Sequence, residues 1–241
     1  MSRTHVARRT RWLARGVLPA LMAACLAACD ARTDVERQRE AAVREAEQEP
    51  LTPPLAGLRR TGSLTLADRR AWLPILQWPT ACEEAFQTSH AGDDGGITFH
   101  PLAPGLTTVD VICAAGAYQP SHVFLRLDER GSSPTTELLR FPALVTEDGL
   151  HVEPTVETEI AGEAVVSDDG EELAVLAFSR QTRDCGIWSR FSITGTHPRL
   201  VDAAASLPCP STPSEPVAGW TSERPPAGWR PQPIDTQQQR R

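Results

Sequence analysis

The sequence contains no lysine and no asparagine, and it has a single tyrosine among its 241 residues. Positive charge therefore comes from arginine alone, and the 24 arginines are outnumbered by 31 acidic residues. Because five of the arginines lie in the first 28 residues, which contain no acid, the rest of the chain carries 19 positive and 31 negative charges, a formal net charge of −12. A surface of that sign repels phosphate groups, which argues against nucleic acid as a partner.

The short motifs of common enzyme classes are missing as well. The sequence has no P-loop, no dinucleotide-binding glycine motif, no H-E-x-x-H and no glycine-flanked nucleophile. Ser121, His122 and Asp110 could supply a nucleophile, a base and an orienting acid, but we expect Ser121 and His122 to be turn residues at the start of a strand. The histidines beyond the first 28 residues show no metal-ligand spacing: His90, His100, His122, His151 and His197.

Acidic pairs at Asp93-Asp94 and Asp168-Asp169 stand beside glycines. Such pairs can hold calcium, but acids next to glycine are also typical of turns, and we favour the turn interpretation. We therefore predict no catalytic residue, no bound cofactor and no metal site from the sequence.

The first 28 residues have the three parts of an export signal. An arginine-rich segment runs through Arg15, an apolar segment too short to span a bilayer covers residues 16–28, and small residues precede a cysteine. Leu26-Ala27-Ala28-Cys29 resembles the lipobox of bacterial lipoproteins, whereas Met22-Ala23-Ala24-Cys25 is a weaker match because it lacks the branched aliphatic residue. The resemblance implies cleavage before Cys29 and attachment of fatty acids such as palmitate to that cysteine, and two or more acyl chains form a stable anchor.

From this leader we predict a lipoprotein of the cell envelope, anchored in a membrane through lipid on Cys29 and facing the periplasm. The sequence leaves open whether the inner or the outer membrane holds it.

The chain beyond residue 28 divides into three parts by composition. Residues 29–60 begin with Cys29 and a stretch rich in Ala, Arg, Glu and Gln, which predicts a solvated helical or disordered tether rather than a partner-binding coiled coil. Residues 61–209 have the pattern of a folded domain. Proline, serine and glutamine dominate residues 210–241, which predicts a largely disordered tail, although Trp220 and Trp229 could pack on the domain.

Within residues 61–209, a short helical lead-in precedes a series of strands. Residues 68–73 have a helical pattern that should end at Pro74, and residues 80–83 have the spacing of a capping box that opens a second helix. Beyond Gly95 the residues alternate in polarity, and Asp168-Asp169-Gly170 predicts a hairpin turn. The expected strands are residues 97–100, 107–113, 122–127, 136–141, 155–160, 163–166, 173–179, 188–193 and 199–203. We predict a mainly β domain with an antiparallel sheet or a sandwich or barrel-like arrangement.

Four cysteines remain in this domain: Cys82, Cys113, Cys185 and Cys209. An even number in an oxidising compartment indicates two disulfides, and the spacing is too wide for a zinc site. Three pairings are possible. We favour Cys82 with Cys113 and Cys185 with Cys209, because each bridge then joins neighbours along a meandering β chain, and each is worth about 3 kcal/mol on the chain-entropy model.

Two segments carry the cysteines in a recognisable setting. The first is the run V-D-V-I-C-A-A-G-A-Y from Val109 to Tyr118, and the second combines Asp184-Cys185-Gly186 with Trp188 and Cys209. Together, over residues 72–209, they resemble a bacterial family of unknown function, the domain of unknown function 1176. The resemblance implies an envelope location and is consistent with disulfides, and it carries no established chemistry.

The sequence thus favours a non-enzymatic envelope module that binds a protein, peptidoglycan or another envelope component. Tyr118, beside small residues, is a possible recognition surface, and packing next to Cys113 is its alternative role. The alternative function is a periplasmic hydrolase with an unrecognised active site. A cleft that holds His100, His122 or His151 against an acid and a serine would favour the hydrolase, whereas an exposed apolar or aromatic patch would favour the binding module.

Overall fold

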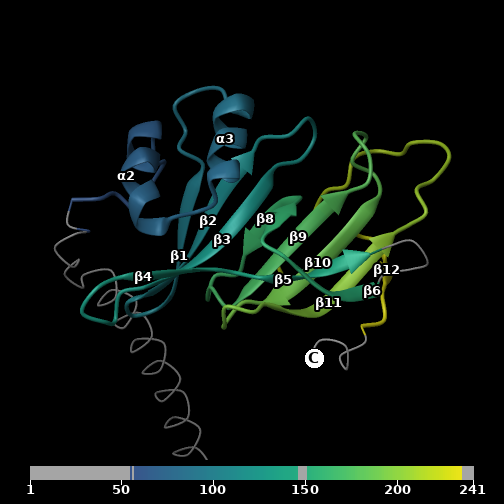
Figure 1. Cartoon of the computed structure of the whole chain (residues 1–241). Helices are drawn as coiled ribbons and strands as arrows, with labels where there is room; N and C mark the ends of the chain where they lie inside the picture. The colour runs from purple at the N-terminus through teal and green to yellow at the C-terminus, as the bar shows by residue number, and fades with distance from the viewer. Residues whose placement is uncertain (1–54, 56, 146–150, 235–241) are drawn as a thin grey trace, which may run out of the picture. The chain divides into compact units, whose positions relative to one another are not determined.

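The computed structural model describes residues 55, 57–145 and 151–234 of the chain. The predicted export signal, Cys29 and most of the predicted tether lie outside the described residues. In the described part, two short helices precede antiparallel strands, which confirms the predicted mainly β class with a helical lead-in (Figure 1). Neither of these helices is long and apolar enough to cross a membrane.

The first helix, α2 (Leu66–Leu76), is longer than its sequence pattern predicts. Pro74 lies inside the helix instead of ending it, and the helix ends where Gln77 adopts a left-handed conformation and donates its N–H to the Leu73 carbonyl. Leu76 and Trp72 are buried against the sheet. Burial of Leu76 thus accompanies two further residues of helix beyond the proline, which shows how tertiary packing overrides a local helix-breaking signal.

The capping box belongs to α2 and not to the second helix, α3 (Thr80–Ser89). The Thr65 hydroxyl accepts from the Asp68 N–H at 3.3 Å, and the Asp68 carboxylate accepts from the Thr65 N–H at 2.8 Å. α3 begins after Pro79 without a side-chain cap. Glu83, which the predicted box needed, instead accepts from Arg69 Nε at 2.8 Å in the interior. The predicted helix is present, and its predicted cap is wrong.

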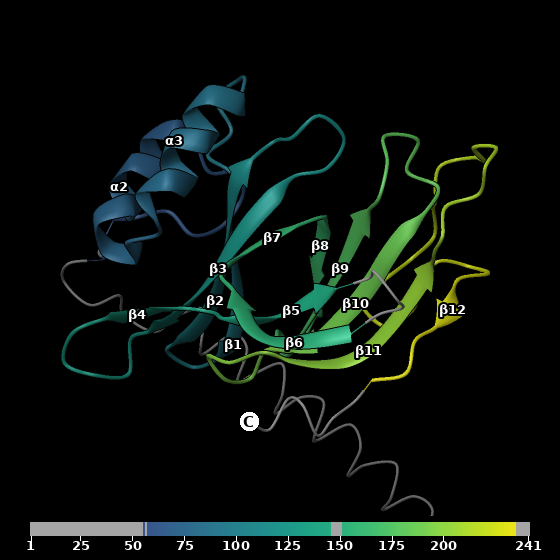
Figure 2. The ribbon, with the colours of Figure 1, turned by 45° about the vertical axis from the view of Figure 1, so that its right-hand side comes forward.

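The first sheet has the strand order β1-β2-β3-β4, and β7 pairs with the same strand β3 at its other end (Figure 2). One face carries Val109, Val111 and Leu125 and packs against Trp72 and Leu76 of α2. The helices therefore cover this face of the sheet. The bounds are β1 (Ile97–Ala103), β2 (Leu106–Ala114), β3 (Ser121–Asp128), β4 (Thr135–Leu138) and β7 (Glu159–Ala161).

The second sheet has the order β12-β11-β10-β9-β8. The predicted hairpin turn joins β8 to β9, where Gly170 has φ 71° and a Cβ would lie 2.6 Å from the Pro101 carbonyl oxygen, so glycine is required. The strands of this second sheet are β8 (Glu163–Val166), β9 (Glu172–Phe178), β10 (Gly186–Ser192), β11 (Arg199–Ser206) and β12 (Arg230–Pro231).

A separate two-stranded ladder contains β5 (Phe141–Val145) and β6 (His151–Glu157). The single strand predicted at 136–141 is therefore divided between β4 and β5. Between them the Leu139 N–H donates to the Phe124 carbonyl, and the Arg140 N–H donates to the Thr196 carbonyl. Leu139 is fully buried, and this turn into the core ends β4.

The second face of the first sheet shares a core with the second sheet. Phe124 of β3 meets Phe141 edge-on with ring centroids 5.8 Å apart, and Phe141 meets Phe191 of β10 at 5.2 Å. Leu173 of β9 and Leu200 of β11 belong to the same cluster. The two sheets are thus held together by apolar burial, which is the main source of folding free energy.

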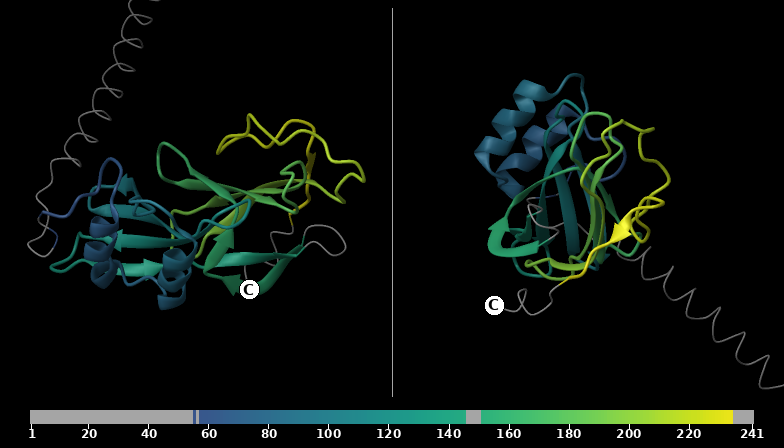
Figure 3. Two further views of the ribbon diagram at one scale, coloured as in Figure 1. Left: turned by 90° about the horizontal axis from the view of Figure 1, so that it is seen from above. Right: turned by 90° about the vertical axis from the view of Figure 1, so that its right-hand side faces the viewer.

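Residues 210–234 lie along the second sheet, whereas composition predicted a largely disordered tail from residue 210 (Figure 3). Trp220 and Trp229 pack against the cluster around Trp188, as considered from the sequence, and β12 pairs with β11. Composition alone misses this order because it depends on contacts with a distant sheet. Residues 235–241 lie outside the described residues.

Candidate functional site

The four domain cysteines form the predicted pairs. Cys82 of α3 is bonded to Cys113 of β2, and Cys185 is bonded to Cys209. Cys82, Cys113 and Cys185 are buried. The first bridge ties the helical layer to the sheet, and the second ties the start of the tail to the start of β10.

Asp184 holds the tail beside the second disulfide. Its carboxylate accepts from the Ser214 N–H at 2.8 Å and from the Thr182 hydroxyl at 2.6 Å, and it forms a bidentate ion pair with Arg180. These hydrogen bonds, led by the Arg180 guanidinium, hold the pKa of Asp184 far below its usual range. A Cβ on the next glycine, Gly186, would lie 2.0 Å from the Ala177 oxygen. The D-C-G segment therefore has a structural role.

Tyr118 is partly buried and packs against the cluster of Trp188, Leu176 and Phe178 on the second sheet. The preceding Gly116 has φ 63° and turns the chain out of β2. The side chain of Gln119 then accepts the Phe178 N–H at 2.7 Å. In the described chain the segment from Gly116 to Gln119 thus joins the two sheets.

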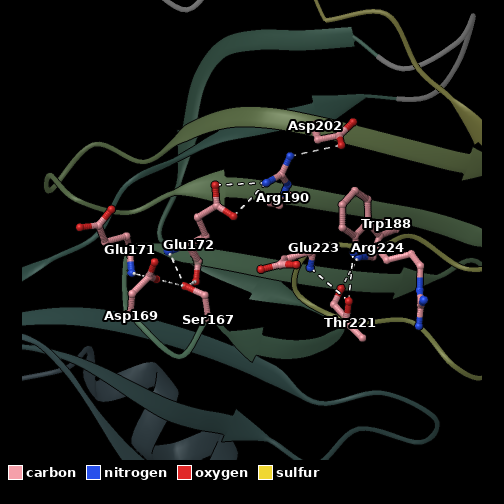
Figure 4. A network of polar contacts seen from close by, with 10 residues as sticks. All are labelled: Ser167, Asp169, Glu171, Glu172, Trp188, Arg190, Asp202, Thr221, Glu223 and Arg224. Atoms are coloured by element: carbon pink, nitrogen blue, oxygen red, sulfur yellow. Dashed lines mark hydrogen bonds and ion pairs between the residues drawn. The ribbon is translucent and has the colours of Figure 1, made fainter. Parts of the chain in front are cut away.

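The same face of the second sheet carries a polar network next to the tail (Figure 4). Arg190 donates to Glu172 at 2.9 Å and lies 3.4 Å from Asp202, so each neighbouring strand supplies one acid. Trp188, two residues before Arg190, donates its indole N–H to the Thr221 carbonyl of the tail at 3.3 Å. These charges are paired with one another.

His122 and Asp110 are brought together on the face of the first sheet that meets the second sheet. His122 Nδ1 lies 2.7 Å from the Asp110 carboxylate, and the two side chains are 7% and 15% exposed. Burial lowers the pKa of His122, but Asp110 and the backbone of Gly162 raise it more, so the pKa lies above its usual value. His122 Nε2 is buried without a hydrogen-bond partner.

This pair has the geometry of a base and its orienting acid, but the serine of the sequence hypothesis is elsewhere. Ser121 and His122 are consecutive in β3, so their side chains point to opposite faces of the sheet. His100 lies near Asp110, and burial lowers its pKa while Asp110 partly offsets that effect. The buried pair is well placed to join strands β2 and β3.

The remaining candidates have local roles. His90 stacks on Phe86 with ring centroids 4.4 Å apart, and His197 is exposed. His151 begins β6. The Asp94 carboxylate accepts the Gly96 N–H, and the Asp169 carboxylate accepts the Glu171 N–H, which are turn contacts. Among the described residues no group of three or more His, Cys, Asp or Glu side chains is arranged to hold a metal ion.

A polar pocket of about 220 Å³ lies where the end of β3 meets β4 and the loop after β10. Its charged lining comes from Arg126, Asp128, Arg130 and Glu137. The rest of the lining is Leu106, Thr135, Thr194, Gly195 and Thr196. Arg130 donates two hydrogen bonds from its guanidinium and a third from its backbone N–H to the Asp128 carboxylate, and these lower the pKa of Asp128 to about 2.

Arg126 is unusual among the arginines of the described chain. Arg126 is only 6% exposed, and its guanidinium donates to the backbone carbonyls of Ile193, Thr194 and Gly195. Burial, followed by the nearby Arg130 charge, lowers its pKa. Every other described arginine that is not exposed forms an ion pair with a carboxylate: Arg60 with Glu129, Arg69 with Glu83, Arg180 with Asp184, Arg183 with Glu163, and Arg190 with Glu172 and Asp202.

Sequence reasoning missed this pocket. Arg126 and Glu137 are eleven positions apart and become neighbours only through the β3–β4 register, while Thr194 and Thr196 arrive from a loop of the other sheet. The one available signal was an arginine in an otherwise apolar strand, V-F-L-R-L. Buried charges require compensation, so such a residue marks a position of interest.

The fold and this pocket define a disulfide-linked antiparallel β domain with a small polar pocket. The chain matches no protein-family model, no curated protein and no solved structure. The resemblance to the domain of unknown function 1176 therefore stays a hypothesis.

Proposed function

We propose that this chain is a lipid-anchored protein of the bacterial cell envelope that binds an envelope component, either peptidoglycan or another protein, without catalysing a reaction. The pocket carries this proposal, because its arginine, acid and threonine side chains converge on one small open site. Convergent polar groups in a concave site are typical of ligand binding.

The proposed location is supported by two independent features. The lipobox-like segment ending at Cys29 fits a lipoprotein, and the two disulfides are typical of oxidising compartments. The D-C-G and G-A-Y segments that resemble the domain of unknown function 1176 agree with this location.

A cross-linking experiment in the native envelope tests the proposal. The full chain carrying an affinity tag is cross-linked in intact cells, solubilised in detergent and recovered together with what it holds. We expect one envelope component in a fixed ratio to the chain, identified by mass spectrometry or by muramic acid analysis. Recovery of the chain alone, at several cross-linker lengths, would contradict a binding function.

The His122–Asp110 pair favours the alternative, a periplasmic hydrolase. A hydrolase requires a nucleophile beside Nε2, and Ser121 of the same strand points to the other face. Hydrolysis of a chromogenic ester or of peptidoglycan by the full chain, lost in His122→Gln but kept in His197→Gln, would replace the binding proposal.

A further inference from the structure

The pocket contains two oppositely charged side chains that are neighbours in the sheet but form no ion pair with each other. Arg126 of β3 and Glu137 of β4 are direct partners in the antiparallel register, and both line the pocket. Directly opposite residues in such a ladder have Cβ atoms about 5 Å apart on one face of the sheet, and oppositely charged pairs there normally attract. Among the described contacts, however, no hydrogen bond or ion pair joins these two side chains.

The reason lies in the loop after β10. The Arg126 guanidinium donates to the carbonyls of residues 193–195. The Arg140 N–H donates to the Thr196 carbonyl of the same loop and so holds the loop in place. The carbonyls of residues 193–195 accept from the two terminal nitrogens of Arg126 but supply no net negative charge, and Arg126 Nε is buried without a hydrogen-bond partner. Glu137 is exposed and has no ion pair in the described chain. The Asp128 carboxylate already accepts hydrogen bonds from the Arg130 guanidinium.

We propose that the pocket binds an α-amino acid group, with its carboxylate against Arg126 and its ammonium against Glu137. This inference rests on the proposed binding function and names its ligand class. Neither Arg126 nor Glu137 forms an ion pair in the described chain, although Asp128 lies close enough to offset part of the Arg126 charge. The two charges match a zwitterion, whereas a plain anion would be repelled by Glu137 and a plain cation by Arg126. Thr135, Thr194 and Thr196 also line the pocket.

The size of the pocket agrees with such a ligand. Its volume of about 220 Å³ lies below the roughly 300–1,000 Å³ of typical small-molecule pockets. It admits a group of amino-acid size and leaves the remainder of a larger molecule outside. The same chemistry occurs in a free amino acid and in a cell-wall peptide whose diamino acid keeps an ammonium and a carboxylate on one side-chain carbon, and the test must separate these sources.

Calorimetric titration of the full chain in detergent tests the charge requirement with three probes: glycine, acetate and methylammonium. We expect glycine to bind at least about tenfold more tightly than either singly charged probe, the difference expected for one ion pair of modest strength. Glu137→Gln should remove the preference for glycine over acetate. Glu159→Gln is the matched control, because Glu159 is an exposed acid of β7 on the same edge of β3, and it should leave the preference unchanged.

Arg126→Gln should weaken glycine binding by more than about tenfold, since one partner of a buried charge contact is lost. Arg126→Lys should restore part of it by returning the charge. Circular dichroism shows whether these variants fold; if neither does, the Glu137→Gln comparison decides alone. Equal binding of glycine and acetate by the wild type, or an unchanged preference in Glu137→Gln, would overturn the proposal.

Sedimentation with purified peptidoglycan separates the two sources. If the full chain sediments with peptidoglycan and glycine displaces it, the ligand is the free amino-acid end of a diamino acid in the wall; if it binds glycine alone, the ligand is a free amino acid. Both outcomes support the pocket assignment. Sedimentation that glycine, Glu137→Gln and Arg126→Gln all leave unchanged would reject the pocket while keeping the proposed binding function.

Discussion

Arg69 lies in the interior with only 1% of its surface exposed, between the rings of Phe86 and Trp78. Its guanidinium carbon is 3.6 Å from the Phe86 ring centroid and its Nε donates to Glu83 at 2.8 Å. Glu83 also accepts the Trp78 indole N–H at 3.0 Å. The Glu83 carboxylate of α3 thus compensates the buried charge of Arg69 in α2, and this ion pair links the two helices.

Glu83→Gln should therefore destabilise the domain strongly. The amide keeps the shape of the side chain but leaves the Arg69 charge buried without a counter-ion, which costs about 3 kcal/mol. The free energy of unfolding in urea measures the effect. Glu84→Gln changes the exposed neighbour in the same helix and should cost less than about 0.5 kcal/mol. Similar values for the two variants would show that Glu83 does not carry this role.

The His122–Asp110 contact should make stability depend on pH. Burial alone lowers the pKa of His122, yet the Asp110 charge, the hydrogen bond to Asp110 and the Gly162 backbone together outweigh it, so the folded-state pKa lies above the unfolded value of 6.5. The charged His122 therefore stabilises the fold fully below about pH 6.5, and this contribution is lost as the pH rises through the folded-state pKa.

Urea unfolding of the wild type and of His122→Gln across this range measures the contribution. We expect the difference in free energy to be largest at low pH and to shrink as the pH rises. His197→Gln removes an exposed imidazole and should give a pH-independent difference. A difference that grows with pH would mean that burial dominates and that His122 is neutral in the fold.

At the scale of elements, the tail is held by a few contacts at its start. Asp184 binds Ser214, the Arg183 carbonyl accepts the Val217 N–H at 2.8 Å, and Cys209 is bonded to Cys185. Asp184→Ala removes the contact with Ser214 and the ion pair that orients Arg180 towards the Pro210 carbonyl, while the disulfide stays, so residues 211–229 should be cleaved several-fold faster in limited proteolysis. Asp168→Ala, in an exposed turn, should match the wild type. Equal cleavage of all three proteins would show that Asp184 does not hold the tail against the domain.

The elements that the sequence predicted are those whose signals are local. Alternation located β8 with the same bounds, Glu163–Val166, and the glycine at position 170 located the hairpin turn. The disulfide pairing followed from the order of strands in a meander. The cap of α3 was misplaced because Glu83 has a buried partner fourteen positions away, which no local pattern contains.

The tail and the pocket show the same limit over longer distances. Trp220 and Trp229 lie in a proline-rich segment whose composition does not predict order. They become ordered by packing against the second sheet around Trp188. Arg126 becomes part of a site only when a strand register and a loop of the other sheet are known together. The candidate site therefore depends on tertiary structure, and none of its charge pattern can be read from spacing.

For the whole molecule, position in the cell decides which ligands the pocket meets. The four bonded cysteines fit an oxidising compartment, and the ligand that we propose for the pocket is a small polar group of the kind found in the cell wall. If a lipid holds the domain at the membrane, its local concentration near the wall is high and a weak individual contact suffices for retention. Anchoring is thus part of the proposed function and requires its own test.

The anchor prediction rests on the lipobox-like segment Leu26-Ala27-Ala28-Cys29. A radiolabelled or alkyne fatty acid fed to cells should label the wild type, because the Cys29 thiol is the proposed attachment point, and Cys29→Ser should lose the label entirely. Since stable anchoring takes two or more acyl chains, the serine variant should also move from the membrane to the soluble fraction. Cys25→Ser, which alters the weaker match, is the matched control and should keep both label and membrane location. A Cys29→Ser protein that stays labelled and membrane-bound would show that another residue holds the lipid.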